Sequence, residues 1–148
     1  MPRIERTADV TWTGNVARGQ GKLSGGSGAL QLMPFTLATR IGEPEGKTSP
    51  EELLAGAVGT CFTMSLANEL SQAKTPPEML SVDVKTVMDE VGDRHLVTEV
   101  QLHVRGRVPG LDAAQFEEAA QRAEAGCPLA HLVRGTAAVT LSASLDES

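Results

Sequence analysis

One long stretch of the chain predicts a helix that is apolar on nearly every side. Ser49 precedes Pro50 and lies three residues before Glu52, which is the pattern of a capped helix start with proline at its first position. Apolar residues then recur at helical spacing from Leu53 to Leu70. Because the first three turns carry few polar side chains, this helix must be covered on several sides. Any fold of this chain therefore has to place other elements around the helix.

The segments on either side of this helix carry strand and helix patterns in a definite order. Short strands and turns are expected over the first 35 residues, and polarity alternates with the period of a strand at 81–86, 96–106 and 137–145. Asp112 predicts a second helix that ends at Gly126, and Cys127-Pro128 predicts a short third helix. The order β-β-β, α, β-β, α-α, β indicates one α+β domain over residues 1–148, with strands in antiparallel pairs.

Composition predicts a soluble, metal-free domain. The 148 residues include 13 basic and 19 acidic side chains, a formal net charge of −6, so neither nucleic acid nor an anionic membrane is an expected partner. We find no run of about 18 apolar residues, which predicts no membrane span. The polar N-terminus lacks a secretory apolar segment, so a cytoplasmic location is expected. Two cysteines and three histidines lack the spacing of a zinc site, and no cofactor is expected.

The two cysteines lie in different predicted surroundings. Cys61 falls within the apolar helix, where a cysteine often serves only as a small hydrophobic side chain. Cys127 precedes Pro128 at a helix N-terminus, where free amides and the helix dipole are expected to lower the pKa of its thiol. Cys127 could equally act only as a cap. His131, one turn after Cys127, leaves open a Cys/His enzyme for acyl transfer or thioester hydrolysis.

Three charged residues are candidates for a site with Cys61. Glu51 lies in the first turn of the long helix, ten residues before Cys61, which is about 15 Å of helical rise. The two side chains cannot meet within one straight helix, so a shared site would need two copies of the helix and hence a dimer. Arg18 lies in a glycine-flanked loop and Arg40 precedes a long polar loop; each could be a plain surface arginine.

Taken in order, these motifs resemble the osmotically inducible protein C and organic hydroperoxide resistance (OsmC/Ohr) family. The resemblance spans nearly the whole chain and rests on Ser49-Pro50-Glu51-Glu52-Leu53, Cys61-Phe62 and Gly126-Cys127-Pro128. The segments Thr39-Arg40 and Pro109-Gly110-Leu111-Asp112 favour the OsmC-like branch. The fold implied by this resemblance is an intertwined homodimer, in which antiparallel sheets wrap around central helices and two active sites lie at the interface.

The resemblance also implies a thiol peroxidase that reduces organic or lipid hydroperoxides to alcohols without a cofactor. Cys61 would be the peroxidatic residue and form a sulfenic acid, and Cys127 would be the resolving residue that closes an intramolecular disulfide. A dithiol such as dihydrolipoamide, or a lipoylated protein, would restore both thiols. Glu51 and one arginine would hold the thiolate and orient the peroxide; Arg18 matches one branch of the family and Arg40 the other.

An apolar approach to the thiol would favour organic peroxides over hydrogen peroxide. The residues expected to line it are Met33, Phe35, Phe62 and Leu129. Two other functions stay open beside the peroxidase. One is the Cys127/His131 hydrolase or acyl-transferase, and the other is a non-catalytic domain that senses redox state or binds a small molecule.

Overall fold

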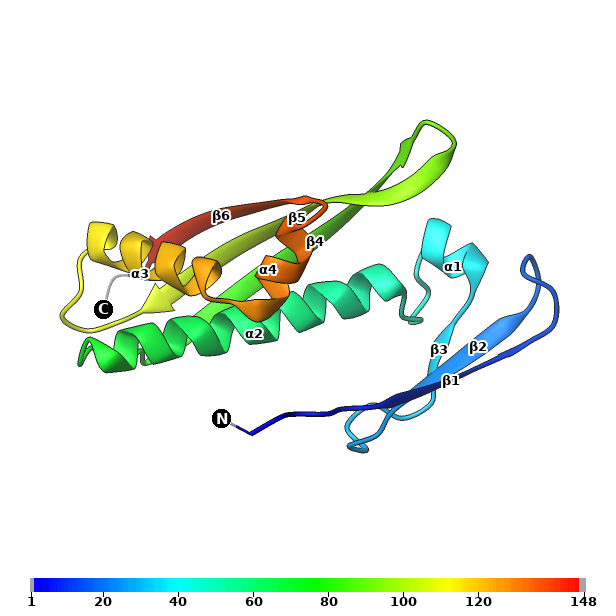
Figure 1. Cartoon of the computed structure of the whole chain (residues 1–148), viewed down its shortest axis with the longest axis horizontal. Coiled ribbons are helices and arrows are strands. Elements are labelled where there is room, and N and C mark those ends of the chain that lie inside the picture. Colours follow the sequence, from blue (N-terminus) through cyan, green and yellow to red (C-terminus); the bar gives the residue numbers. More distant parts are fainter. Residues whose placement is uncertain (1, 147–148) are drawn as a thin grey trace. The chain divides into compact units, whose positions relative to one another are not determined.

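The chain forms strands and helices in the predicted order, with one short helix added. The computed structural model describes residues 2–146. Its elements (Figure 1) are β1 (Ala8–Thr13), β2 (Gln20–Gly25), β3 (Met33–Phe35), α1 (Leu37–Ile41), α2 (Pro50–Gln72), β4 (Met79–Val91), β5 (Arg94–Arg107), α3 (Ala113–Ala125), α4 (Pro128–Arg134) and β6 (Ala138–Leu145). The mixed α+β class is confirmed. The helix α1 was not predicted, because five residues are too few to show a helical period.

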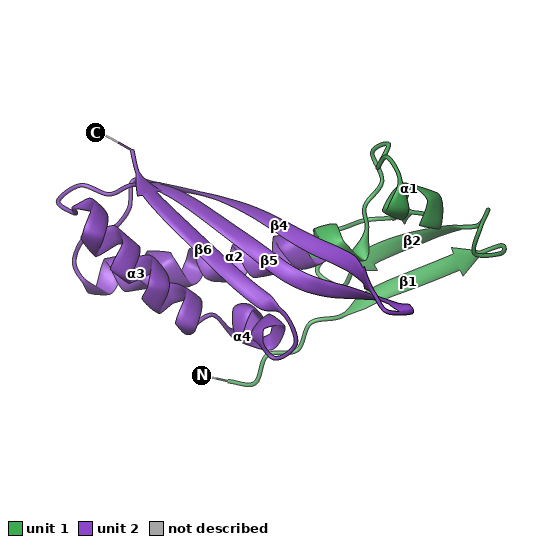
Figure 2. Cartoon of the chain, turned by 90° about the horizontal axis from the view of Figure 1, so that it is seen from above, with its two compact units in different colours: residues 1–53 green, residues 54–148 purple. Residues whose placement is uncertain are grey.

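Two compact units, Met1–Leu53 and Leu54–Ser148, divide the chain, and the division falls within α2 (Figure 2). In the first unit, β1, β2 and β3 form an antiparallel sheet in that order. The rings of Trp12 and Phe35 pack 5.7 Å apart between their centroids. Gly21 lies beneath the Phe35 ring, where a Cβ atom would come within 2.2 Å of a ring carbon. This glycine therefore lets the Phe35 ring lie directly against β2.

In the second unit, β4, β5 and β6 form the other sheet, and its topology corrects one prediction. β4 and β5 are an antiparallel hairpin, joined at Gly92-Asp93 with Gly92 at a φ of 65°. β6, however, pairs with β5 in parallel. After β5 the chain passes through α3 and α4 before it enters β6, and such a helical crossover returns the chain to the end at which β5 began. The prediction that all strands are antiparallel is therefore wrong for this pair.

The core of the second unit lies between its sheet and its helices. α2, α3 and α4 lie on the same face of the sheet (Figure 2), and the core side chains of β5 on that face alternate with exposed ones. Each element contributes fully buried side chains: Phe62 and Leu66 from α2, Val100 and Val104 from β5, and Phe116 from α3. Burial of each such side chain contributes about 1.5–3 kcal/mol. This packing positions the middle of α2 against the end of α3.

Only part of the apolar surface of α2 is covered within the chain. Its buried residues are Val58, Gly59, Phe62, Leu66 and Leu70, whereas Met64 on another side is 68% exposed. Among residues 2–146, α2 is the one helix long and apolar enough to cross a membrane, with 28% of its most apolar 18-residue window buried. The sequence prediction of no membrane span rested on the lack of a continuous apolar run, and it stays a prediction. The central helix of a soluble protein meets the same criteria, so length and composition are weak evidence for a membrane span.

Candidate active site

The two cysteines lie together in the second unit. Cys61 is half-buried on α2, and Cys127 is fully buried at the residue that caps α4. Both are free thiols, and they lie close enough for the Cys61 side chain to influence the ionisation of Cys127. Gly126 ends α3 and Pro128 begins α4, so Cys127 occupies a two-residue turn held between two helices. Only one of the two thiols can therefore be reached from solvent.

Burial raises the pKa of the Cys127 thiol above its ordinary value. Interaction with the Cys61 side chain and its charge raises this pKa further, while the backbone amides of Ala130 and Leu129 lower it. The amide of Ala130 does reach the sulfur, at 3.5 Å, as expected for a cap. The prediction of a lowered pKa is nevertheless wrong, because the helix terminus that supplies these amides lies in a desolvated site.

In the first unit, an ion pair joins Arg40 to Glu51. Nε and Nη2 of Arg40 donate to Oε1 of Glu51 at 2.9 and 2.6 Å, and Nε is 3.2 Å from Oε2. The hydrogen bond to Glu51 raises the pKa of the guanidinium, which burial lowers. α1 carries the arginine in its last turn, and α2 carries the glutamate in its first. Each charged side chain is thus fixed by the end of a helix.

Arg18 is placed differently from Arg40. It lies exposed in the turn between β1 and β2, where its backbone amide donates to Oδ1 of Asn15 at 2.8 Å. Within residues 2–146, the arginine that forms an ion pair with Glu51 is Arg40. Of the two arginines suggested by the sequence, the structure brings only Arg40 to this carboxylate.

The start of α2 explains why Glu51 is available for this pair. The Ser49 hydroxyl accepts a hydrogen bond from the Glu52 amide at 3.2 Å, as the capping pattern predicts. The Glu52 carboxylate accepts from the Thr48 hydroxyl, also at 3.2 Å. Glu52 is thus used at the helix start, and the neighbouring Glu51 is left to face Arg40.

An apolar cavity of about 360 Å³ lies beside Arg40 in the first unit. Its lining residues are Trp12, Val16, Phe35, Thr36, Leu37, Arg40, Thr48, Ser49 and Pro50. Arg40 thus contributes to a cavity whose wall is mostly hydrocarbon or aromatic. Trp12 and Val16 were missed from the sequence, where the alternation around Trp12 indicated only a strand.

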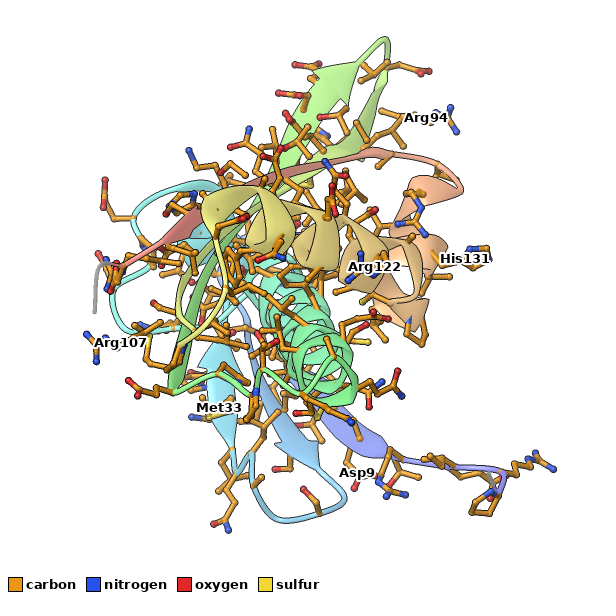
Figure 3. The ribbon with its side chains drawn as sticks, turned by 90° about the vertical axis from the view of Figure 1, so that its left-hand side faces the viewer. Asp9, Met33, Arg94, Arg107, Arg122 and His131 are labelled. Carbon is orange, nitrogen blue, oxygen red and sulfur yellow. The ribbon has the colours of Figure 1, made fainter. Side chains whose placement is uncertain are left out.

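The four residues expected to line a substrate approach divide between the units. Phe35 lines the cavity, and Met33, which Figure 3 labels, lies half-buried on the same strand β3. Phe62 and Leu129 belong to the second unit, where Phe62 is fully buried and Leu129 packs against the core from α4. Two of these four residues thus belong to each unit.

His131 is not brought to the Cys127 thiol. Its backbone amide donates to the Cys127 carbonyl at 2.9 Å, but its side chain is exposed and points away from α4 (Figure 3). A Cys/His nucleophile needs the imidazole within hydrogen-bond reach of the sulfur. Among residues 2–146, no group of three or more His, Cys, Asp or Glu could hold a metal ion.

The raised pKa of Cys127 predicts how stability depends on pH. In a Cys61→Ser background, which removes the second thiol, we compare Cys127 with Cys127→Ala by urea unfolding. Because the folded pKa lies above the unfolded value of about 8.5, the contribution of the protonated thiol is complete below that pH. It is lost as the pH rises through the folded pKa.

We therefore expect the free energy of unfolding of the Cys127 protein to fall relative to the alanine variant above about pH 8.5. A relative gain in stability with rising pH would instead show that the folded pKa is lowered.

Related sequences match this chain over most of its length. The family model described as OsmC-like protein matches residues 42–142. Peroxiredoxin OsmC of Escherichia coli (strain K12) is 34% identical over 142 residues, which cover 96% of this chain and 97% of that protein. The organic hydroperoxide resistance protein of Xanthomonas axonopodis pv. citri (strain 306) is 28% identical, with 95% of each chain covered.

Solved structures match the fold at lower sequence identity. An OsmC-like protein of unknown function from Vibrio cholerae has a TM-score of 0.76 at 17% identity, covering 95% of this chain and 99% of that one. An organic hydroperoxide resistance protein OsmC from Legionella pneumophila has a TM-score of 0.72 at 20% identity, covering 98% and 100%. The sequence matches and the structural matches agree with each other. The chain belongs to the OsmC-like protein family.

Proposed function

We propose that this protein is a thiol peroxidase that reduces organic hydroperoxides to alcohols. The observation that carries the proposal is the pair of interacting free thiols, one half-buried and one fully buried. Such a pair can be oxidised stepwise, first at the accessible sulfur and then to a disulfide. Relatives named peroxiredoxin and organic hydroperoxide resistance protein support this chemistry.

The reaction uses the sulfurs in two steps. The Cys61 thiolate attacks one peroxide oxygen and the O–O bond breaks; the other oxygen takes a proton and leaves as the alcohol. Cys61 becomes a sulfenic acid, and the Cys127 thiol then displaces its oxygen as water and forms the disulfide. A dithiol such as dihydrolipoamide, free or on a lipoylated protein, donates two electrons and two protons and restores both thiols.

The environment of Cys127 suits the second step better than the first. Its raised pKa keeps the thiol protonated, and its burial keeps it from competing for peroxide. Once Cys61 is a sulfenic acid, its sulfur carries no negative charge. One of the contributions that raise the pKa of Cys127 then disappears, so Cys127 ionises more easily when it is needed.

We assign the peroxide pocket to Arg40, Glu51 and the apolar cavity beside them. The guanidinium, held by Glu51, would stabilise the thiolate and bind a peroxide oxygen. The cavity of about 360 Å³ would take an alkyl, acyl or aryl group. Hydrogen peroxide has no such group, so organic or lipid hydroperoxides are the proposed substrates. The cytoplasm is the proposed location.

We further propose a homodimer in which this pocket serves the thiol of the partner copy. Glu51 and Cys61 are ten residues apart on α2, about 15 Å of rise, so they cannot meet within one copy of the helix. Large apolar side chains that stay exposed among residues 2–146 support an interface: Val10 is 58%, Ile41 71% and Met64 68% exposed. A second copy laid on these surfaces would bury them.

The thiol roles are tested by steady-state consumption of cumene hydroperoxide with dihydrolipoamide as reductant. Wild type should turn over, and Cys61→Ser should show no consumption above background, since the remaining thiol of Cys127 is buried and protonated. Cys127→Ser should consume about one equivalent and then stop or overoxidise to sulfinic acid. Loss of the first equivalent in Cys127→Ser would reverse the roles, and oxidation of wild type without turnover would indicate a redox sensor.

The arginine assignment is tested with a matched pair of variants. Arg40→Ala removes a charged hydrogen-bond donor and should lower the rate of Cys61 oxidation about 10- to 100-fold. Arg18→Ala removes the same charge from an exposed turn and should leave that rate near wild type. Stopped-flow measurement under single-turnover conditions isolates this step from the reductant. A large effect of Arg18→Ala alone would move the role to Arg18.

The shared site is tested by mixing two inactive variants. In a heterodimer of Arg40→Ala with Cys61→Ser, one of the two sites would hold both native residues. Equal amounts refolded together should therefore recover about a quarter of wild-type activity. No recovery from a mixture shown to contain heterodimers would place both residues in one copy, and a monomer by sedimentation at micromolar concentration would contradict the dimer.

A further inference from the structure

We propose that Ser65 and Arg134 are positioning residues that hold Cys127 against Cys61 by completing the C-terminal end of α3. The inference rests on the proposed function of the two thiols, and it concerns how fast and how completely they pair. α3 ends at Ala125, two residues before Cys127, so the position of the buried sulfur depends on the position of this helix end. Both side chains reach that end from other helices.

Ser65 is the contact from α2. It lies one helical turn after Cys61 on the same helix, and positions four apart lie on one face. Its hydroxyl donates to the Ala123 carbonyl of α3 at 2.9 Å. One face of α2 thus binds the end of α3 through Ser65 and meets Cys127 through Cys61.

Arg134 is the contact from α4. Its Nη1 donates to the Glu124 carbonyl at 3.1 Å and also binds the Glu124 carboxylate, and Nη2 donates to the Ala125 carbonyl at 3.4 Å. The guanidinium therefore spans the last two residues of α3. Because Arg134 ends α4, which Cys127 caps at the other end, the contact closes the turn that contains the buried thiol.

Together these contacts complete the hydrogen bonding of the helix end. The last four carbonyls of a helix have no partner within the helix. Here the Gly126 amide binds the Arg122 carbonyl, the Cys127 amide binds that of Glu124, and Ser65 and Arg134 supply donors to the others. An orphaned carbonyl at a packed helix end is unfavourable, so the end is expected to shift or fray when either side chain is removed.

The consequence for the reaction is specific to the second thiol. Disulfide formation depends on the effective concentration of Cys127 at Cys61, which falls when the geometry loosens. Cys61 itself is carried by α2, whose core packing does not involve the Ser65 hydroxyl. Loss of the helix-end contacts should therefore impair disulfide formation and leave the attack of Cys61 on peroxide unchanged.

The experiment measures pairing of the thiols without peroxide. The full-length protein is equilibrated with mixtures of reduced and oxidised dithiothreitol, and the disulfide fraction is read by thiol labelling and mass spectrometry. In this exchange the two cysteines lose two electrons and two protons to the oxidised reagent. The equilibrium constant gives the effective concentration of Cys127 at Cys61 for each variant.

Two variants remove the contacts, and two serve as controls. Ser65→Ala and Arg134→Met, which keep similar bulk, should each lower the effective concentration about fivefold. Ser65→Thr keeps the hydroxyl, so the effective concentration of Cys127 at Cys61 should stay near the wild-type value. Glu69→Gln weakens the exposed Glu69–Arg122 ion pair, which is another contact between α2 and α3. This variant should leave the effective concentration unchanged. A general loosening of the helices would lower the value in Glu69→Gln as well.

A second readout is the fate of Cys61 under excess cumene hydroperoxide. Slower pairing should increase the fraction of Cys61 sulfinic acid in Ser65→Ala and Arg134→Met, at an unchanged rate of first oxidation. Wild-type pairing in both variants would overturn this inference and leave the peroxidase proposal intact. A wild-type protein that forms no Cys61–Cys127 disulfide at any reagent ratio would overturn both the resolving role of Cys127 and the inference built on it.

Discussion

The packing of α2 against its own sheet and α3 is the interaction on which the rest of the second unit depends. Phe62 and Leu66 of α2 are fully buried, and they meet buried side chains of β5 and α3. This packing fixes the rotation of α2 about its axis. Cys61 precedes Phe62 by one residue, so the same rotation places it at the edge of the core, where Cys127 lies. The thiol pair is thus a consequence of core packing.

The same rotation leaves apolar surface uncovered on the other side of α2. Met64 is exposed there, and in the first unit Val10, Trp12 and Ile41 are exposed as well. A single chain of this size has too few elements to enclose a helix that is apolar nearly all round. The proposed second copy answers that requirement, and it also explains how Glu51 and Cys61 could serve one site although one helix keeps them apart.

Two kinds of chemistry are kept in separate environments. The thiols lie in a desolvated setting, which raises the pKa of Cys127 and keeps it protonated. The charged pair of Arg40 and Glu51 lies at the ends of two helices beside an apolar cavity. A peroxide has a polar O–O group and, in organic peroxides, an apolar substituent. A guanidinium next to a hydrocarbon wall matches both parts of such a molecule.

Local patterns in the sequence were sufficient for most elements. The start of α2 at Pro50, the cap at Asp112 and the turn at Gly92-Asp93 all depend on residues close together in the chain, and all were predicted. The parallel pairing of β6 with β5 was not, because it depends on where a crossover of two helices returns the chain. The helix α1, which carries Arg40, was not predicted because its five residues are too few to show a helical period in the sequence.

By itself the sequence determined the class of fold and the family resemblance, because these follow from residue types and their spacing, and it made the two cysteines the candidate reactive groups. Tertiary structure decided the direction of the Cys127 pKa shift, since desolvation depends on what surrounds the sulfur and outweighs the local helix terminus. It also decided that Arg40 binds Glu51, and that Ser65 and Arg134 each donate to a carbonyl at the end of α3. Each of these contacts joins residues of different elements, and a pattern along the chain does not record them.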